Sequence, residues 1–454
     1  MQERETEEIF DNGIDSELKG LASIQLELFN HYLEHTAKSI AVDGADLDAL
    51  TIGIRRLVAE SRIITNSVLA LAAIQKCSAI IKHPKSRIEG DHAQVEYLLH
   101  AAEQYHWQTL QQAPTDAGHM SRYDHVMANA ALMVLYSCAG HSVRISLMGT
   151  NNGGNYRSGA FRPGELQWVS MIRAIQMAYS GLATSKPKAF AINEFDDSTK
   201  SQICRIDTPS SLTSEFDLSG ASGPRPRTGQ LFFPIVAATW HGALDRLHAS
   251  ARLAVQKSRE TDSVEPDLLS EPARSSPEYQ MCISALHILK NIFQEIFLAP
   301  PLTPPPPPKP NAQSEKDEIA KLEPWLRDYL ARVTSKTRHK PLRRAIMAFV
   351  HRLPSGYIEL VQSALKPEGI PLNDERLRLQ RLAVDIFAHW LVLVMLLDCI
   401  WWIGDVGSWE LEHAISAMRS QRHLDGTETL DCWWPQSMYI TKLEIDRHDV
   451  RDLD

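Results

Sequence analysis

The chain has 454 residues, a formal net charge of −9 and a hydrophobic fraction of 44%. These values are ordinary for a globular protein and exclude a disordered chain, a collagen-like chain and a coiled-coil rod. The net acidity argues against a broad nucleic-acid-binding surface, because phosphate contacts need clustered lysine and arginine. A chain of this length has enough residues for a large core in one or two domains.

The six cysteines are widely spaced, and no two of them are closer than 33 residues. They lie at positions 77, 138, 204, 282, 399 and 432. This spacing excludes a local zinc signature and a dense disulfide framework. We therefore expect reduced, mostly buried thiols in an intracellular protein. The first residues, Met1 to Glu5, are polar and charged, so we expect no secretory signal there.

Apolar residues at helical spacing dominate the first part of the chain after a polar tail at 1–20. The stripes predict helices over residues 21–40, 64–81, 95–110, 126–137 and 169–179. In the first of them, Leu26 and Phe29 are expected on one packed face, and Leu28 and Tyr32 lie beside them. This breadth indicates a helix that is packed on more than one side.

Two polar stretches interrupt the helical pattern of the region 21–299. Residues 184–230 are rich in Ser, Asp, Pro and Gly and predict a long loop, and residues 257–278 predict a second one. A helix is expected to resume near Phe233, with Pro234 in its first turn. A clear apolar stripe over 283–296 predicts the next helix.

Residues 300–316 begin with PPLTPPPPPKP and predict a stiff polyproline II linker. The alternative is a docking strip for a proline-reading partner. Helical spacing returns in the region 317–454, which we expect to pack on the first region. No stretch has convincing strand character. The predicted fold class is all-α, a large multi-helix bundle or irregular α-superhelical regulatory domain.

One segment, 386–403, has the length and apolar character of a marginal membrane span. It contains His389 and Asp398, and an aspartate at the centre of a membrane helix costs about 2.5–3.5 kcal/mol to insert. We therefore predict a buried core helix and no membrane partner.

Sequence motifs for catalysis are missing: the chain has no G-x-S-x-G, no P-loop and no dinucleotide-binding glycine motif. The pair Asp196 and Asp197 lacks the third aspartate expected of an isoprenoid-type magnesium motif. His241, Asp245 and His248 share one helical face, but no fourth ligand is evident, and a polar helix edge is the favoured interpretation. We assign no catalytic residue, metal ligand or cofactor.

A basic cluster before a predicted helix is a candidate for nuclear import or phosphate contact, although such runs are usually only solvated. It comprises Lys336, Arg338, His339, Lys340, Arg343 and Arg344.

Four separated segments together resemble a known family. The first has Leu28, His31, Tyr32 and Thr36, and the second runs from Ser61 to Ala73. The third is the WVSMIRA segment at 168–174, and the fourth joins the helix 387–398 to Trp401, Trp402, Gly404 and Gly407. In this order they resemble the fungal-specific transcription factor domain, the regulatory region that follows the zinc binuclear cluster of fungal activators.

The resemblance implies an all-α nuclear protein that controls a metabolic or secondary-metabolite gene cluster. It also implies dimerisation or other regulators as partners, and a small-molecule effector. The cysteines do not form the compact zinc cluster that reads DNA in this family. We therefore expect no direct DNA binding by this chain, and a cytoplasmic location is the alternative to the nucleus.

Four tryptophans, Trp240, Trp390, Trp401 and Trp402, are candidates to line a ligand pocket, although large aromatic residues on helices are usually core. Two alternatives remain: an all-α enzyme of natural-product biosynthesis and a non-catalytic scaffold. An enzyme should show a polar cavity with a carboxylate pair or a histidine of shifted pKa. A ligand-sensing regulator should show an apolar cavity, and a scaffold an exposed apolar groove.

Overall fold

The structure is a computed structural model that describes residues 23–82, 89–116, 123–150, 166, 168–174, 224–262, 276–298, 322–334, 342–365, 374–423 and 433–451. Every regular element in these residues is a helix, which confirms the predicted all-α class. The predicted tail at 1–20, the proline-rich linker at 300–316 and the pair Asp196 and Asp197 lie outside the described residues.

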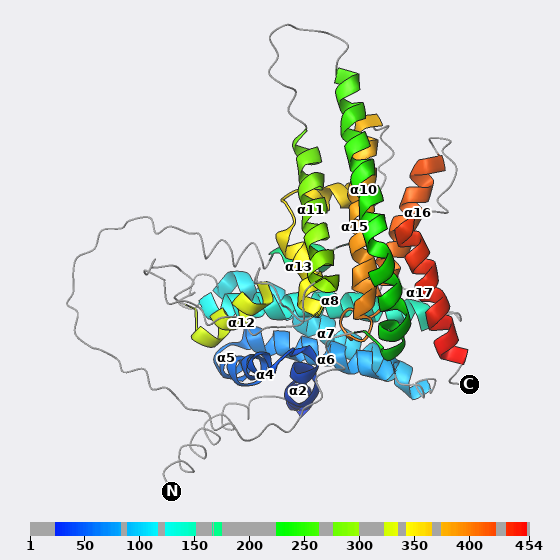
Figure 1. The fold of residues 1–454 in the computed structure, drawn as a ribbon. Coiled ribbons are helices and arrows are strands. Elements are labelled where there is room, and N and C mark those ends of the chain that lie inside the picture. The colour runs from blue at the N-terminus through cyan, green and yellow to red at the C-terminus, as the bar shows by residue number, and fades with distance from the viewer. Residues whose placement is uncertain are drawn as a thin grey trace, which may run out of the picture.

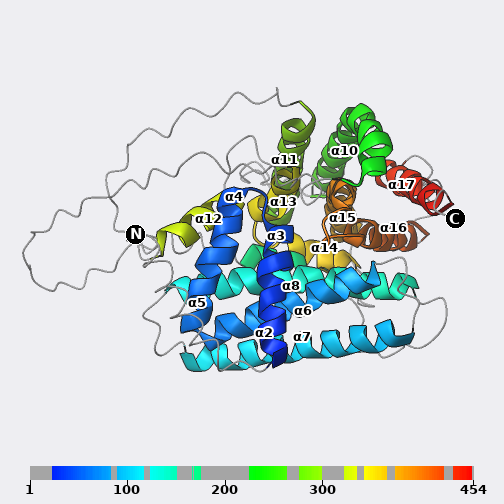
Figure 2. The ribbon, with the colours of Figure 1, turned by 90° about the horizontal axis from the view of Figure 1, so that it is seen from below.

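The N-terminal helices form a layer in which α6, α7 and α8 lie side by side and α2 crosses α6 (Figure 2). In chain order the elements are α2 Ser23–His31, η1 Tyr32–Thr36, α3 Ala37–Ile40, α4 Gly44–Asp48, η2 Ala49–Gly53, α5 Ile54–Glu60, α6 Arg62–Ile81, α7 Glu89–Asp116 and α8 Tyr123–Thr150. α6 is the centre of this layer and is largely buried.

The later helices form an upright group on this layer, with α10, α11, α15, α16 and α17 standing together and α13 near their base (Figure 1). In chain order the elements of the later part of the chain are η6 Thr228–Phe232, α10 Phe233–Asp262, α11 Pro277–Phe297, α12 Pro324–Thr334, α13 Leu342–Arg352, α14 Tyr357–Leu365, α15 Asp374–Val394, η8 Met395–Leu397, α16 Val406–His423 and α17 Trp434–Arg451.

Local sequence signals explain where several helices begin. The Ser61 hydroxyl caps α6 by accepting a hydrogen bond from Ile64 N at 3.5 Å. The Asp43 carboxylate caps α4 by accepting one from Asp46 N at 2.8 Å. Ser276 caps α11, and Pro277 occupies its first turn, where a missing N–H costs nothing.

The apolar segment 386–403 forms the buried end of α15, the short helix η8 and the turn that follows. The prediction of a buried segment is confirmed. By length and composition alone, three described helices are long and apolar enough to cross a membrane: Arg62–Ile81, Tyr123–Met148 and Glu375–Leu397. In the last of these, 89% of the apolar window is buried within the chain.

The structure differs from the predicted elements in several places. Leu26 was expected on a packed face but is 40% exposed. The wider π turn of η1 lies between Leu26 and the buried Ala37 and Ile40, so a single helical wheel over 21–40 wrongly puts Leu26 on their face. The loop predicted over 184–230 is also too long, because η6 already begins at Thr228. The described α10 continues to Asp262, past the predicted end at 257.

Helices before and after the proline-rich segment share one continuous core. Hydrogen bonds also join the two regions. Trp434 Nε1 donates to Thr239 Oγ1 at 2.9 Å, and Ser142 Oγ donates to the Trp401 carbonyl at 3.1 Å. The residues that the structure describes therefore behave as one packed body on both sides of the linker.

Among the residues that the structure describes, no cysteine forms a disulfide bond. Cys77, Cys138 and Cys282 are buried and Cys399 is half-buried. Burial raises the pKa of the three buried thiols to about 12, so they stay protonated at neutral pH. Cys204 and Cys432 lie outside the described residues.

Candidate functional site

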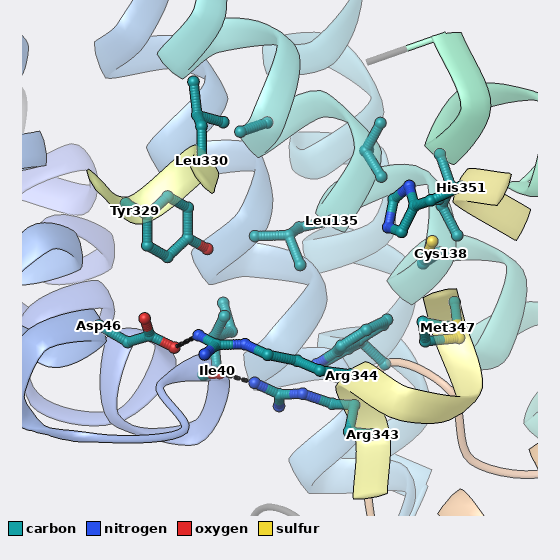
Figure 3. A pocket seen from close by; sticks show the side chains of 14 residues that line it. Ile40, Asp46, Leu135, Cys138, Tyr329, Leu330, Arg343, Arg344, Met347 and His351 are labelled. Carbon is teal, nitrogen blue, oxygen red and sulfur yellow. Dashed lines mark hydrogen bonds and ion pairs between the residues drawn. The ribbon is translucent and has the colours of Figure 1, made fainter. Parts of the chain in front are cut away.

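Helix α8 separates two cavities of opposite character. The first, called here the apolar cavity, has a volume of about 110 Å³ and lies where the lower layer meets α12, α13 and the turn after α15 (Figure 3). It is lined by Ile40, Asp46, Ala131, Val134, Leu135, Cys138, Ile172, Tyr329, Leu330, Arg343, Arg344, Met347, His351 and Trp402. A cavity of about 150 Å³ holds a benzene ring, so this smaller space suits a molecule with fewer heavy atoms.

One charged pair on the wall of the apolar cavity is well compensated. The Arg344 guanidinium donates a short hydrogen bond to Asp46 Oδ2 and lies 3.8 Å from Asp43 Oδ2 (Figure 3). Asp46 Oδ2 also accepts a hydrogen bond from Val42 N at 3.3 Å, just before α4. Both charges therefore have opposite partners, which is the usual condition for burying them.

Arg343, beside it, is only partly compensated. Its side chain is 6% exposed, and its Nη2 donates to the Ile40 carbonyl at 2.5 Å. The guanidinium carbon lies 5.5 Å from the centroid of the Trp402 ring, a cation–π contact. Among the described residues no carboxylate lies within 4.0 Å of it, and Nη1 has no hydrogen-bond acceptor. Burial lowers the pKa of Arg343 to about 10, with Asp46 and Asp43 opposing that shift.

Trp402 completes this wall and carries a second unsatisfied donor. It is 7% exposed, and its Nε1–H has no acceptor among the described residues. Buried indole N–H groups usually find a partner, because an orphan donor loses its bond to water. The apolar cavity thus has two buried donors, one of them cationic, and otherwise mostly hydrocarbon walls.

The second cavity, called here the polar cavity, has a volume of about 370 Å³ on the opposite side of α8. It is lined by Glu103, His106, Trp107, Tyr136, Ser137, His141, Arg144 and Trp168. Arg144 Nη2 donates to Glu103 Oε1 at 3.0 Å. His106 stacks on Tyr136 with 4.3 Å between ring centroids. Burial, together with the Arg144 charge, lowers the pKa of His106 to about 4, and burial raises the pKa of Tyr136.

A buried carboxylate lies behind the polar cavity. Glu410 accepts a hydrogen bond from Trp168 Nε1 at 2.9 Å, and the same oxygen lies 3.2 Å from His141 Nε2. The His141 Nε2 atom is buried and makes no hydrogen bond to a described residue. The three side chains connect α8, the helix at 168–174 and α16.

The four predicted tryptophans have different environments. Trp402 lines the apolar cavity. Trp240 stacks on Phe293, and Trp390 stacks on Phe349, so both are core residues. Trp401 is half-buried, and its Nε1 donates to Ser39 Oγ at 2.8 Å. Of the four, Trp402 is the one that the structure places at a cavity.

The predicted basic patch needs a correction at two of its residues. In the wall of the apolar cavity Arg343 is buried and Arg344 is half-buried, because neighbouring carbonyl and carboxylate groups bind them, and they form no exposed cluster. Lys336, Arg338, His339 and Lys340 lie outside the described residues.

The metal hypothesis for α10 is not supported. His241 and Asp245 are exposed, and His241 stacks on Trp240. Among the described residues no group of three or more His, Cys, Asp or Glu side chains lies close enough to hold a metal ion. The polar helix edge beside the buried Leu244 and Leu247 is the interpretation that fits.

Comparisons with protein-family models, with curated proteins and with solved structures found no match to this chain. The resemblance to the fungal-specific transcription factor domain therefore stays a prediction.

Sequence reasoning missed most residues of both cavities. His106, His141 and Glu410 belong to no motif, and only folding brings Glu410 to His141. One sequence feature did point to the cavities. The apolar stripe predicted over 126–137 forms a half-buried face of α8, on which Val134 lines the apolar cavity and Ser137 lines the polar cavity.

Proposed function

We propose that this chain is a transcription regulator-like protein of the fungal zinc-cluster type, without the DNA-reading cluster in this sequence. In this proposal its helical body binds a small-molecule effector in the apolar cavity and acts through partner regulators or a second copy of itself. Support comes from the ordered resemblance segments and from the all-α fold that they imply.

The observation that carries the proposal is the position of the apolar cavity. Its walls come from Ile40 and α8 in the lower layer and from Tyr329, α13 and Trp402 after the proline-rich segment. A ligand in this place contacts both regions at once. Because a ligand favours whichever packing it fits better, binding here shifts the balance between their arrangements.

Residues of the resemblance segments lie at structural junctions, which fits a regulatory body. His31 Nε2 lies 2.5 Å from Gln75 Oε1 and links α2 to α6. The Tyr32 hydroxyl donates to the Leu50 carbonyl at 3.0 Å and links η1 to η2. Trp402, from the closing segment, lines the apolar cavity itself.

The enzyme alternative is favoured by one observation, the polar cavity with a histidine of shifted pKa. A pKa near 4 makes His106 a weak base at neutral pH, whereas general acid–base catalysis works best with a pKa near the working pH. Glu103 and Arg144 are paired with each other. These groups suit binding better than proton transfer, so the regulator is the preferred proposal.

A fusion experiment tests the proposed function. The full chain is joined to an unrelated DNA-binding domain, and transcription of a reporter with the matching site is measured in fungal cells. We expect reporter output to change, and we expect Ala131→Leu, which fills the apolar cavity, to alter that output. Ala238→Leu on the exposed face of α10 is the matched control and should behave like the unmodified chain. A fusion that enters the nucleus and leaves the reporter unchanged would contradict the proposal.

A further inference from the structure

The apolar cavity contains an electrostatic imbalance that points to a class of ligand. Arg343 brings a positive charge into a space whose other walls are mainly hydrocarbon. Its neighbour Arg344 already engages Asp46, the one carboxylate among the lining residues described, and also Asp43 nearby. A buried guanidinium without its own carboxylate is costly, because it loses hydration that one carbonyl and one aromatic face replace only in part.

Two donors point to the same kind of acceptor. Arg343 Nη1 and Trp402 Nε1 are both buried, both belong to side chains that line the cavity, and neither has an acceptor among the described residues. The guanidinium carbon is 5.5 Å from the indole centroid. Since each donor reaches an acceptor about 2.9 Å away, the two oxygens of one carboxylate can serve both.

We propose that the apolar cavity binds a small monocarboxylate whose carboxylate is held by Arg343 and Trp402 and whose apolar body lies against Leu135, Met347 and Val134. The inference rests on the proposed function, since it names the chemical class of the effector. The volume of about 110 Å³ is below the about 150 Å³ that holds a benzene ring, so it limits the body to a short branched chain.

A carboxylate fits this site better than a phosphate. Arg344 is occupied, and the two orphan donors of Arg343 and Trp402 match the two planar oxygens of a carboxylate. A phosphate dianion needs more donors than these to replace its water. Hydrocarbon walls also favour an apolar body, which free phosphate lacks.

Isothermal titration of the purified full chain tests the inference with isobutyrate, its neutral analogue isobutyramide, and inorganic phosphate. We expect isobutyrate to bind about 10-fold or more tightly than isobutyramide, the gain of one charge-assisted contact, and phosphate not to bind. Arg343→Met should remove the preference for isobutyrate, and Trp402→Phe should weaken isobutyrate binding. Arg252→Met, on the exposed face of α10, is the matched control and should leave isobutyrate binding unchanged.

Several outcomes would overturn the inference: equal affinity for isobutyrate and isobutyramide, no saturable isobutyrate binding, or isobutyrate binding that survives Arg343→Met. Urea unfolding curves check that each variant is folded, and Arg343→Lys, which keeps the charge but loses the fork of donors, is the second variant if Arg343→Met is unstable. If isobutyramide binds as well as isobutyrate and Ala131→Leu blocks both, the proposed effector cavity is supported and only the preference for a carboxylate is refuted. The reporter experiment decides the proposed function independently of these results.

Discussion

Asp398 is a charged residue inside an apolar segment, and in the fold its carboxylate joins three parts of the chain. Its carboxylate accepts hydrogen bonds from Arg225 N at 2.8 Å and from Thr228 Oγ1 at 2.5 Å, and it lies 3.1 Å from Lys442 Nζ. These partners come from the segment before α10 and from α17. This buried carboxylate therefore links its own segment to the segment before α10 and to α17. The sequence alone identifies neither these links nor the residues that make them.

Replacing this carboxylate should destabilise the protein. Asp398→Asn leaves the buried Lys442 without its buried counter-ion, and we expect the free energy of unfolding to fall by about 2 kcal/mol or more. Urea unfolding of the full chain measures this loss of unfolding free energy. Asp446→Asn removes the more exposed partner of Lys442 and should cost less than about 1 kcal/mol. Equal effects of the two changes would contradict this account.

His106 should make stability depend on pH. Its pKa is lowered from 6.5 to about 4 in the folded chain, so the unfolded state binds more protons between these values. The contribution of His106 to the free energy of unfolding is fully present above pH 6.5 and is lost as the pH falls toward 4. We expect His106→Gln to make the decline of unfolding free energy over this window shallower. An unchanged slope in chemical unfolding at pH 7, 6, 5 and 4 would show that the histidine titrates normally.

Residue types predict the core better than they predict the cavities. Trp240, Trp390 and Trp402 look alike in sequence, since each lies in an apolar neighbourhood. Which of them lines a cavity depends on Arg343 and α8, which are distant in the chain. The same limit explains Arg343: a run of basic residues suggests a solvated patch, and only the fold shows its carbonyl and aromatic partners.

At the scale of elements, long periodic helices were predictable and short ones were not. α6 and α11 both have a serine cap and a regular stripe; α6 was expected to within two residues of its observed bounds, whereas α11 begins at Pro277, six residues before its predicted start. The short elements α4, η2 and α5 are too brief for periodicity to identify, and tertiary packing holds them. For example, Gly53 in η2 lets Trp325 of α12 approach so closely that a Cβ would lie 2.5 Å from its ring.

The start of α16 depends on a second close approach. A Cβ on Gly407 would lie 2.7 Å from the Met395 backbone nitrogen, and backbone atoms cannot move aside as a flexible side chain can. We expect Gly407→Ala to lower the free energy of unfolding by about 1–3 kcal/mol through overpacking. The matched control is Gly44→Ala at the start of α4, where nothing lies within 4 Å of the added carbon.

Thermal unfolding of both variants measures these changes in stability. Gly44→Ala should be neutral or slightly stabilising, because alanine restricts the unfolded chain at no steric cost. If Gly407→Ala is as stable as the unmodified chain, α16 does not pack on η8 as closely as described here.

At the scale of the whole molecule, the proline-rich segment joins two regions that share a core. α11 packs on α13 and α15 across this segment, and its Leu289 and Phe293 are fully buried. A chain divided between Pro305 and Pro306 should therefore give two fragments that fold only together. We expect cooperative thermal unfolding from the co-expressed pair and none from residues 306–454 alone. Cooperative unfolding of the isolated C-terminal fragment would mean that it has a core of its own.

The overall class followed from the sequence because helical periodicity recurs along most of it, whereas the function depends on a resemblance and on cavities that long-range packing creates. The most direct test of the central claim is chromatin immunoprecipitation of the tagged full chain from the cells that express it, followed by sequencing of the recovered DNA. The account predicts enrichment at a limited set of promoters, lost when a partner regulator is removed. A chain that is excluded from the nucleus, or that shows no enrichment at any promoter, would contradict it.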